Sequence, residues 1–134
     1  MKRVAATLAA LGLVLVGCAS APAPSLPPGA VYLLTWSLAP SETRGCYTLP
    51  HQGPTSVDPT YGTAFHGSGA PNGVPIAWPP GYTGRQAGAE VEVLDPTGKV
   101  RAVTGQGLEV YIIDQWTHVT LSEPAPASAF LACG

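Results

Sequence analysis

The three histidines, His51, His66 and His118, are the residues of this chain best suited to acid–base chemistry or metal binding. A metal site needs His, Cys or carboxylate ligands that converge, usually with local pairs in the sequence. No two histidines are close neighbours, so the one set worth considering is His51 and His66 with Asp58. Dispersed surface histidines explain the same pattern more simply, and we predict no metal and no cofactor.

A serine close to His66 raises the question of nucleophilic catalysis. The segment His66-Gly67-Ser68-Gly69 is similar to a nucleophile elbow, which has Gly-x-Ser-x-Gly on a turn from a strand to a helix. Here His66 takes the first glycine position and no helical pattern follows. We therefore interpret the segment as a flexible loop and predict no catalytic residue.

Two carboxylates on one predicted strand, Glu90 and Glu92, could also support acid–base chemistry because they share a face. Arg85, Lys99 and Arg101 are close in sequence, and we expect ion pairs between these cations and the two glutamates. The chain is therefore predicted not to be an enzyme.

The N-terminus has the layout of a secretory signal, with the basic start Met1-Lys2-Arg3 followed by an uncharged apolar stretch to Val16. Its end, Leu15-Val16-Gly17-Cys18, resembles the lipobox of bacterial lipoproteins. That resemblance implies cleavage of residues 1–17 and a lipid on Cys18 that anchors the protein to a membrane of the bacterial cell envelope. Ala19, in place of an aspartate, favours the outer membrane where a cell has two.

The other two cysteines, Cys46 and Cys133, would leave the reducing cytosol with the exported chain. We predict that they form a disulfide, worth roughly 4–5 kcal/mol by loop-closure entropy. Two buried free thiols are the alternative.

Composition excludes some partners. Apart from Lys2 and Arg3, the basic residues are Arg44, Arg85, Lys99 and Arg101, against eight acidic ones. Such a chain has no basic stripe for nucleic acid and no polybasic patch for a membrane. Residues 18–30 are rich in Ala and Pro, and we predict an extended tether that holds the domain on the order of 30 Å from the lipid.

Short strand patterns with turn residues between them fill residues 31–134, and no helical periodicity appears. We therefore predict one all-β domain, a small barrel or sandwich of about six or seven short strands. Residues 50–74 are so rich in Gly and Pro that we expect a long loop there, with one short hairpin around 64–66. The expected strands cover residues 31–38, 45–49, 73–78, 90–94, 99–104, 108–113 and 117–121, and the tail packs back toward Cys46.

The most distinctive segment is Trp78-Pro79-Pro80-Gly81-Tyr82. Exposed aromatic rings stiffened by prolines could contact a glycan or a peptide. Trp78 could instead fill the core, and this structural interpretation is the simpler one. The candidate binding surface is therefore Trp78 and Tyr82, with His51 and His66 from the expected loop.

This segment belongs to a wider pattern. Together with Gly45-Cys46-Tyr47, Val93-Leu94-Asp95-Pro96-Thr97-Gly98-Lys99-Val100 and the late Cys133, it resembles uncharacterised small bacterial lipoproteins. The resemblance implies a small closed β-domain with one disulfide, and it implies no known activity.

These observations favour a lipid-anchored envelope protein that acts as a non-catalytic binding or structural module, with an envelope protein or a glycan as partner. The alternative is a small envelope hydrolase or metal-dependent enzyme that uses the expected 50–74 loop. Clustering of His51 or His66 with an acid or a serine in a cleft would favour the enzyme.

Overall fold

Regular structure in the computed structural model is entirely β, across the residues that it describes: 25–38, 51–67, 70–110 and 119–133. This confirms the predicted all-β class. Within these ranges no helix is long and apolar enough to cross a membrane. The strands are β1 (Ala30–Val31), β2 (Trp36–Leu38), β3 (His51–Asp58), β4 (Gly62–Gly67), β5 (Ala70–Ala77), β6 (Thr83–Ala87), β7 (Glu90–Leu94), β8 (Val100–Val103), β9 (Gly107–Val110), β10 (Val119–Leu121) and β11 (Phe130–Leu131).

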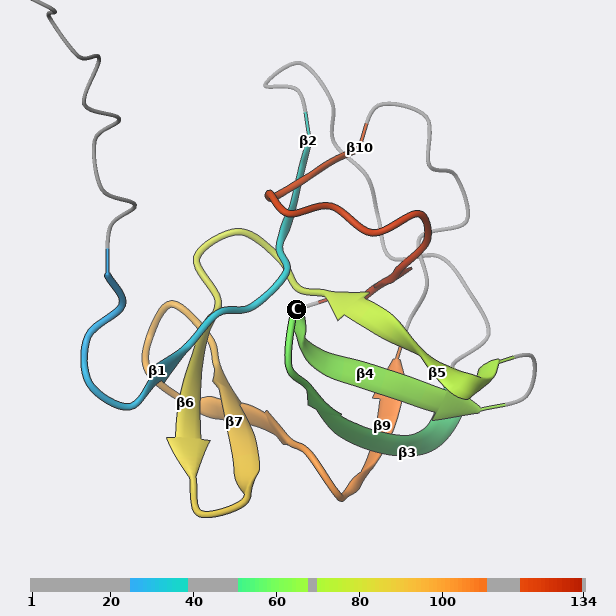
Figure 1. Cartoon of the computed structure of the whole chain (residues 1–134), viewed down its shortest axis with the longest axis horizontal. Coiled ribbons are helices and arrows are strands. Elements are labelled where there is room, and N and C mark those ends of the chain that lie inside the picture. The colour runs from blue at the N-terminus through green and yellow to red at the C-terminus, as the bar shows by residue number, and fades with distance from the viewer. Residues whose placement is uncertain (1–24, 39–50, 68–69, 111–118, 134) are drawn as a thin grey trace, which may run out of the picture.

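Three sheets contain these strands. One has the order β1-β6-β7-β8, a second has the order β11-β5-β4-β3-β9, and β10 pairs with β2. Every pairing is antiparallel except that of β11 with β5. In Figure 1, β3 and β4 bend together in one strong curve, as expected of a small barrel or sandwich.

The long loop expected over residues 50–74 is wrong, because this part of the chain forms β3, β4 and most of β5. Two of its glycines, Gly53 and Gly67, make room for an aromatic ring instead of marking turns. A Cβ on Gly67 would lie 2.5 Å from Cε1 of Phe65, and a Cβ on Gly53 would lie 2.9 Å from Cζ of the same ring. Only a residue without a side chain allows Phe65 to approach the strands so closely.

Two prolines of the expected loop also lie inside a strand. Pro71 and Pro75 lie in the part of β5 that pairs only with β4, since β11 joins β5 at Ile76 and Ala77. A proline costs little where a strand has a neighbour on one side only.

The hairpin predicted over residues 90–104 is confirmed. β7 and β8 pair across a turn at Asp95–Gly98, and Gly98 has a φ of 84°, the left-handed region that favours glycine. The single strand expected over residues 31–38 is divided into β1 and β2. The intervening Leu33 and Leu34 are buried, so that stretch serves the core. The strand expected over residues 45–49 lies outside the described residues.

Two clusters of buried side chains make up the core, and the C-terminal tail contributes to both. Ala132 packs with Phe65, Ile76 and Trp78 in the first, whereas Leu131 packs with Leu34 in the second. Apolar burial of this kind is the main stabilising term in a small domain. The tail therefore packs back onto the domain, as expected.

Cys133 packs against the second cluster, which holds Leu34, Ala77, Ala129 and Leu131. Cys46, its predicted disulfide partner, lies outside the described residues. The disulfide stays a prediction.

Residues 27–30, the end of the expected tether, form main-chain hydrogen bonds. The amide of Ala30 donates a 2.9 Å hydrogen bond to the carbonyl of Pro27, and the amide of Gln86 in β6 donates a 2.8 Å bond to that of Gly29. The first of these bonds is local, and the second shows that hydrogen bonds to the domain begin by Gly29, inside the range assigned to the tether. Residues 18–24, with Cys18, lie outside the described part.

Candidate binding groove

An apolar groove of about 520 Å³ lies where the chain enters the domain. One wall is the extended segment 26–33, and the other is the start of β6. Figure 1 shows the chain at β1 running beside β6 before it turns up toward β2. The lining residues are Leu26, Pro27, Pro28, Gly29, Ala30, Val31, Tyr32, Leu33, Tyr82, Thr83, Gly84, Arg85 and Leu94. Its volume falls within the range of small-molecule sites.

Backbone pairing holds the groove in shape. Ala30 and Val31 pair with Arg85 and Gly84 in antiparallel register. A Cβ on Gly84 would lie 2.8 Å from the carbonyl oxygen of Val31, so glycine is needed for this close approach. Main-chain hydrogen bonds between β1 and β6 therefore shape the groove before any ligand binds.

One groove residue, Tyr82, stacks on Trp78, with 6.0 Å between ring centroids and 14° between the ring planes. Trp78 is only 4% exposed, and its indole N–H donates a 2.9 Å hydrogen bond to Oγ1 of Thr63. Of the two aromatic residues in the predicted binding surface, Trp78 therefore belongs to the core, where its paired N–H fits a buried position. Tyr82 is half-buried and lines the groove.

Two of the polar side chains that line the groove, Arg85 and Tyr32, are already paired. The Arg85 guanidinium forms an ion pair with Glu92, as expected from the sequence. The Tyr32 hydroxyl bonds to Ser122 Oγ at 2.8 Å and donates to the Glu123 carbonyl at 2.9 Å. A ligand in the groove would therefore meet mostly carbon, with few groups left to recognise a polar ligand.

The second carboxylate of the expected pair, Glu90, has a different role. It accepts a hydrogen bond from the Thr104 hydroxyl, which in turn accepts one from the amide of Val91. Glu90 thus joins β7 to the end of β8, and it forms no acid–base pair with Glu92.

A serine–histidine contact is present that the sequence analysis missed. Ser56 Oγ on β3 lies 2.7 Å from Nε2 of His66 on β4. Ser56 pairs with Ala64 across the strands, which places His66 diagonally opposite on the same face. The contact could be foreseen only from the hairpin register, and this part of the chain was expected to be a loop.

Gly73 fixes the position of that imidazole ring. It has a φ of 81°, and a Cβ there would lie 2.7 Å from Cε1 of His66. Among the described residues no carboxylate contacts the His66 ring, and neither Ser56 nor His66 lines the apolar groove. Ser68, the serine considered from the sequence, lies outside the described part.

Two residues of the candidate metal set, Asp58 and His66, have other partners. Asp58 Oδ1 accepts 2.8 Å hydrogen bonds from the amides of Thr60 and Tyr61, so this carboxylate shapes the turn between β3 and β4. Across the described ranges, no group of three His, Cys, Asp or Glu residues is arranged to hold a metal ion. The side chain of His51 and all of His118 lie outside those ranges.

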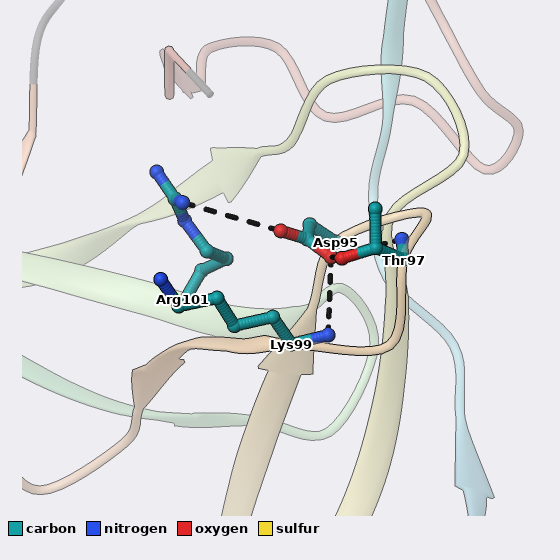
Figure 2. A network of polar contacts seen from close by, with 4 residues as sticks. All are labelled: Asp95, Thr97, Lys99 and Arg101. Carbon is teal, nitrogen blue, oxygen red and sulfur yellow. Dashed lines mark hydrogen bonds and ion pairs between the residues drawn. The ribbon is translucent and has the colours of Figure 1, made fainter.

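Asp95 organises the turn of the β7–β8 hairpin (Figure 2). Its Oδ1 accepts hydrogen bonds from the hydroxyl and amide of Thr97, at 2.6 and 2.9 Å, and from the amide of Lys99 at 3.1 Å. The Thr97 hydroxyl is the main cause that lowers the pKa of Asp95; burial opposes it, and the amides of Lys99 and Thr97 lower the pKa further. Arg101 lies 4.0 Å from Oδ2 and adds a weaker attraction. These contacts explain a stable turn, and they suggest no site.

Comparison with family models, curated proteins and solved structures found no match for this chain. Cys18 also lies outside the described residues. The resemblance to small bacterial lipoproteins therefore remains a prediction from the sequence.

Proposed function

We propose that this protein is a lipid-anchored module of the bacterial cell envelope that binds an apolar ligand without catalysis. The observation that carries the proposal is the groove lined by segment 26–33 and β6, which has a hydrogen-bonded backbone and an apolar lining. Pre-formed apolar concavities of this size are the usual form of a small-molecule site. The lipid would anchor the protein in the membrane, and the groove would bind the apolar ligand.

The anchor rests on the sequence Leu15-Val16-Gly17-Cys18. Cells fed a fatty-acid probe should label the wild-type protein and leave Cys18→Ser unlabelled. Labelling of both proteins, or of neither, would show that Cys18 carries no lipid.

The binding activity can be tested with N-phenyl-1-naphthylamine, an apolar dye that fluoresces when it leaves water. The exported chain with Cys18→Ser keeps every described residue and needs no detergent. We expect the dye to bind this protein, and we expect Thr83→Trp to abolish binding because the indole fills the groove. Thr120→Trp is the matched control, since Thr120 is also an exposed strand threonine but lies on β10. Equal dye binding by both variants would contradict the proposal.

A hydrolase is the second candidate, and the 2.7 Å contact between Ser56 and His66 is the observation in its favour. A histidine that accepts the serine proton is the first requirement of an activated nucleophile. Its test is labelling by a fluorophosphonate, which reacts with activated serines. Labelling that Ser56→Ala and His66→Gln both remove would favour the hydrolase over the binding module. Without such labelling, the pair is a structural cross-strand contact.

A further inference from the structure

The chemistry of the groove narrows its ligand to one class, if the proposed binding function holds. We infer that the groove takes the alkyl chain of a single-chain amphiphile, such as a fatty acid or a long-chain alcohol, present in the water of the envelope. The inference rests on the apolar side chains that line the groove and on its small number of unpaired polar groups.

Polar ligands find little to bind. The guanidinium of Arg85 is held by Glu92, and the hydroxyl of Tyr32 is held by Ser122 and Glu123. The hydroxyls of Tyr82 and Thr83 also line the groove, but sugars, nucleotides and charged peptides would lose more hydrogen bonds to water there than these two groups can replace, which is costly. An alkyl chain has no such requirement.

The apolar side chains give an alkyl chain extended contact. Leu26, Val31, Leu33, Tyr82 and Leu94 line the groove. Leu33 and Leu94 are buried, so Leu26, Val31 and Tyr82 offer most of the apolar surface that a ligand can reach. Leu26 is 54% exposed, and it is one of only three large apolar side chains exposed in the described ranges. A chain laid in the groove would cover this surface, and the gain grows with the buried apolar area.

The position of the groove indicates where the ligand comes from. Six residues lie between Cys18 and Ser25, and the seven residue steps at about 3.1 Å each would reach roughly 20 Å. The groove therefore lies close to the membrane surface, where amphiphiles released from lipids are most concentrated. Chains still inside a bilayer are already out of water and gain little by moving. This favours single-chain amphiphiles in solution over intact bilayer lipids.

The test is a chain-length series that displaces N-phenyl-1-naphthylamine from the Cys18→Ser protein, each compound used below the concentration at which it forms micelles. From eight to fourteen carbons, we expect affinity to rise by up to about fourfold per methylene until the groove is full. Fatty acids and alcohols of equal length should agree within about twofold, because no unpaired charge faces the head group.

Two substitutions locate the site. Leu26→Ala should weaken binding of the longer chains by about fivefold, since it removes apolar area at the groove without adding bulk. Val100→Ala, at a comparably exposed apolar residue on β8, should leave binding unchanged. Equal effects of the two substitutions would overturn the inference.

The outcomes separate this inference from the proposed function. Dye bound at the groove but not displaced by any alkyl compound would refute the alkyl ligand and leave the binding module standing. Displacement that depends on the head group and not on chain length would also refute it. No dye binding at all would refute the proposed function itself.

Discussion

Replacing Gly67 by alanine should destabilise the protein through a single side chain, the ring of Phe65. The added Cβ would lie 2.5 and 2.7 Å from two ring carbons, and the nearest atoms all belong to that ring. Phe65 is 1% exposed and packs edge-on against Phe130, with 5.2 Å between centroids, so it has little room to move. Over-packing of this kind costs about 1–3 kcal/mol.

A smaller partner should relieve the clash. Phe65→Leu alone should cost on the order of 1–2 kcal/mol through lost burial. The double variant should then be more stable than the sum of the two single costs predicts, by about 1 kcal/mol or more. Denaturant unfolding followed by tryptophan fluorescence gives these free energies, provided that the slope with denaturant is unchanged.

Gly53 supplies the matched control. A Cβ there would meet the backbone carbonyl oxygen of His66 at 2.4 Å, in addition to the Phe65 ring. A backbone atom cannot be removed by Phe65→Leu, so Gly53→Ala should remain destabilising in that background. Rescue of Gly53→Ala in that background would refute the backbone clash as the cause of its cost, and additive costs for Gly67 and Phe65 would show that Gly67 is not there to accommodate the ring.

Three other results are expected. Replacing Cys46 and Cys133 together by serine should cost about 2–5 kcal/mol under oxidising conditions, and two free thiols in a mass map of the exported protein would refute the disulfide. Asp95 has a lowered pKa in the folded protein, so its stabilising effect is complete above its unfolded pKa and is lost as the pH falls through the folded value. Asp95→Asn should therefore lose less stability than wild type below about pH 4, measured as the denaturant midpoint against pH. Bound dye at about ten times its dissociation constant should slow exchange of the Gln86 amide about tenfold, with the Gly98 amide in the hairpin turn unchanged.

Local patterns in the sequence predicted the parts of the fold that depend on neighbouring residues. The β7–β8 hairpin follows from the alternation in Glu90–Leu94 and from a turn that ends in a glycine with positive φ. The buried positions of Val91 and Val93 follow from the same alternation.

The β3–β4–β5 sheet could not be predicted in this way, because two of its glycines leave space for the Phe65 ring, whose position depends on tertiary packing. Gly53 and Gly67 look like loop residues when only their neighbours in sequence are considered. The Ser56–His66 contact was missed with the sheet, since it depends on the register of β3 against β4. Tertiary context overrides local composition at these positions.

The groove could not be predicted from the sequence, because its walls come from segments far apart in the chain. Leu26–Leu33 was divided between a tether and a strand, and Tyr82 was considered together with Trp78 as one aromatic surface. In the structure the Trp78 indole belongs to the core, whereas the Tyr82 ring, which stacks on it, lines the groove. Pairing of β1 with β6 then converts the end of the tether into a wall.

This arrangement would connect the proposed lipid anchor to the groove. The segment that would carry the lipid at Cys18 forms the groove wall at residues 26–33. Among the described residues, few main-chain bonds hold this wall on β6: those of the two residue pairs in β1 and the bond from the Gln86 amide to the Gly29 carbonyl. A wall with so few bonds belongs to the less stable parts of a fold, where local opening occurs. A ligand that touches both walls binds only the closed form, so its binding energy also holds the wall on β6. Occupancy of the groove should therefore stiffen the connection between the domain and its anchor, which a rigid pocket remote from the tether could not do.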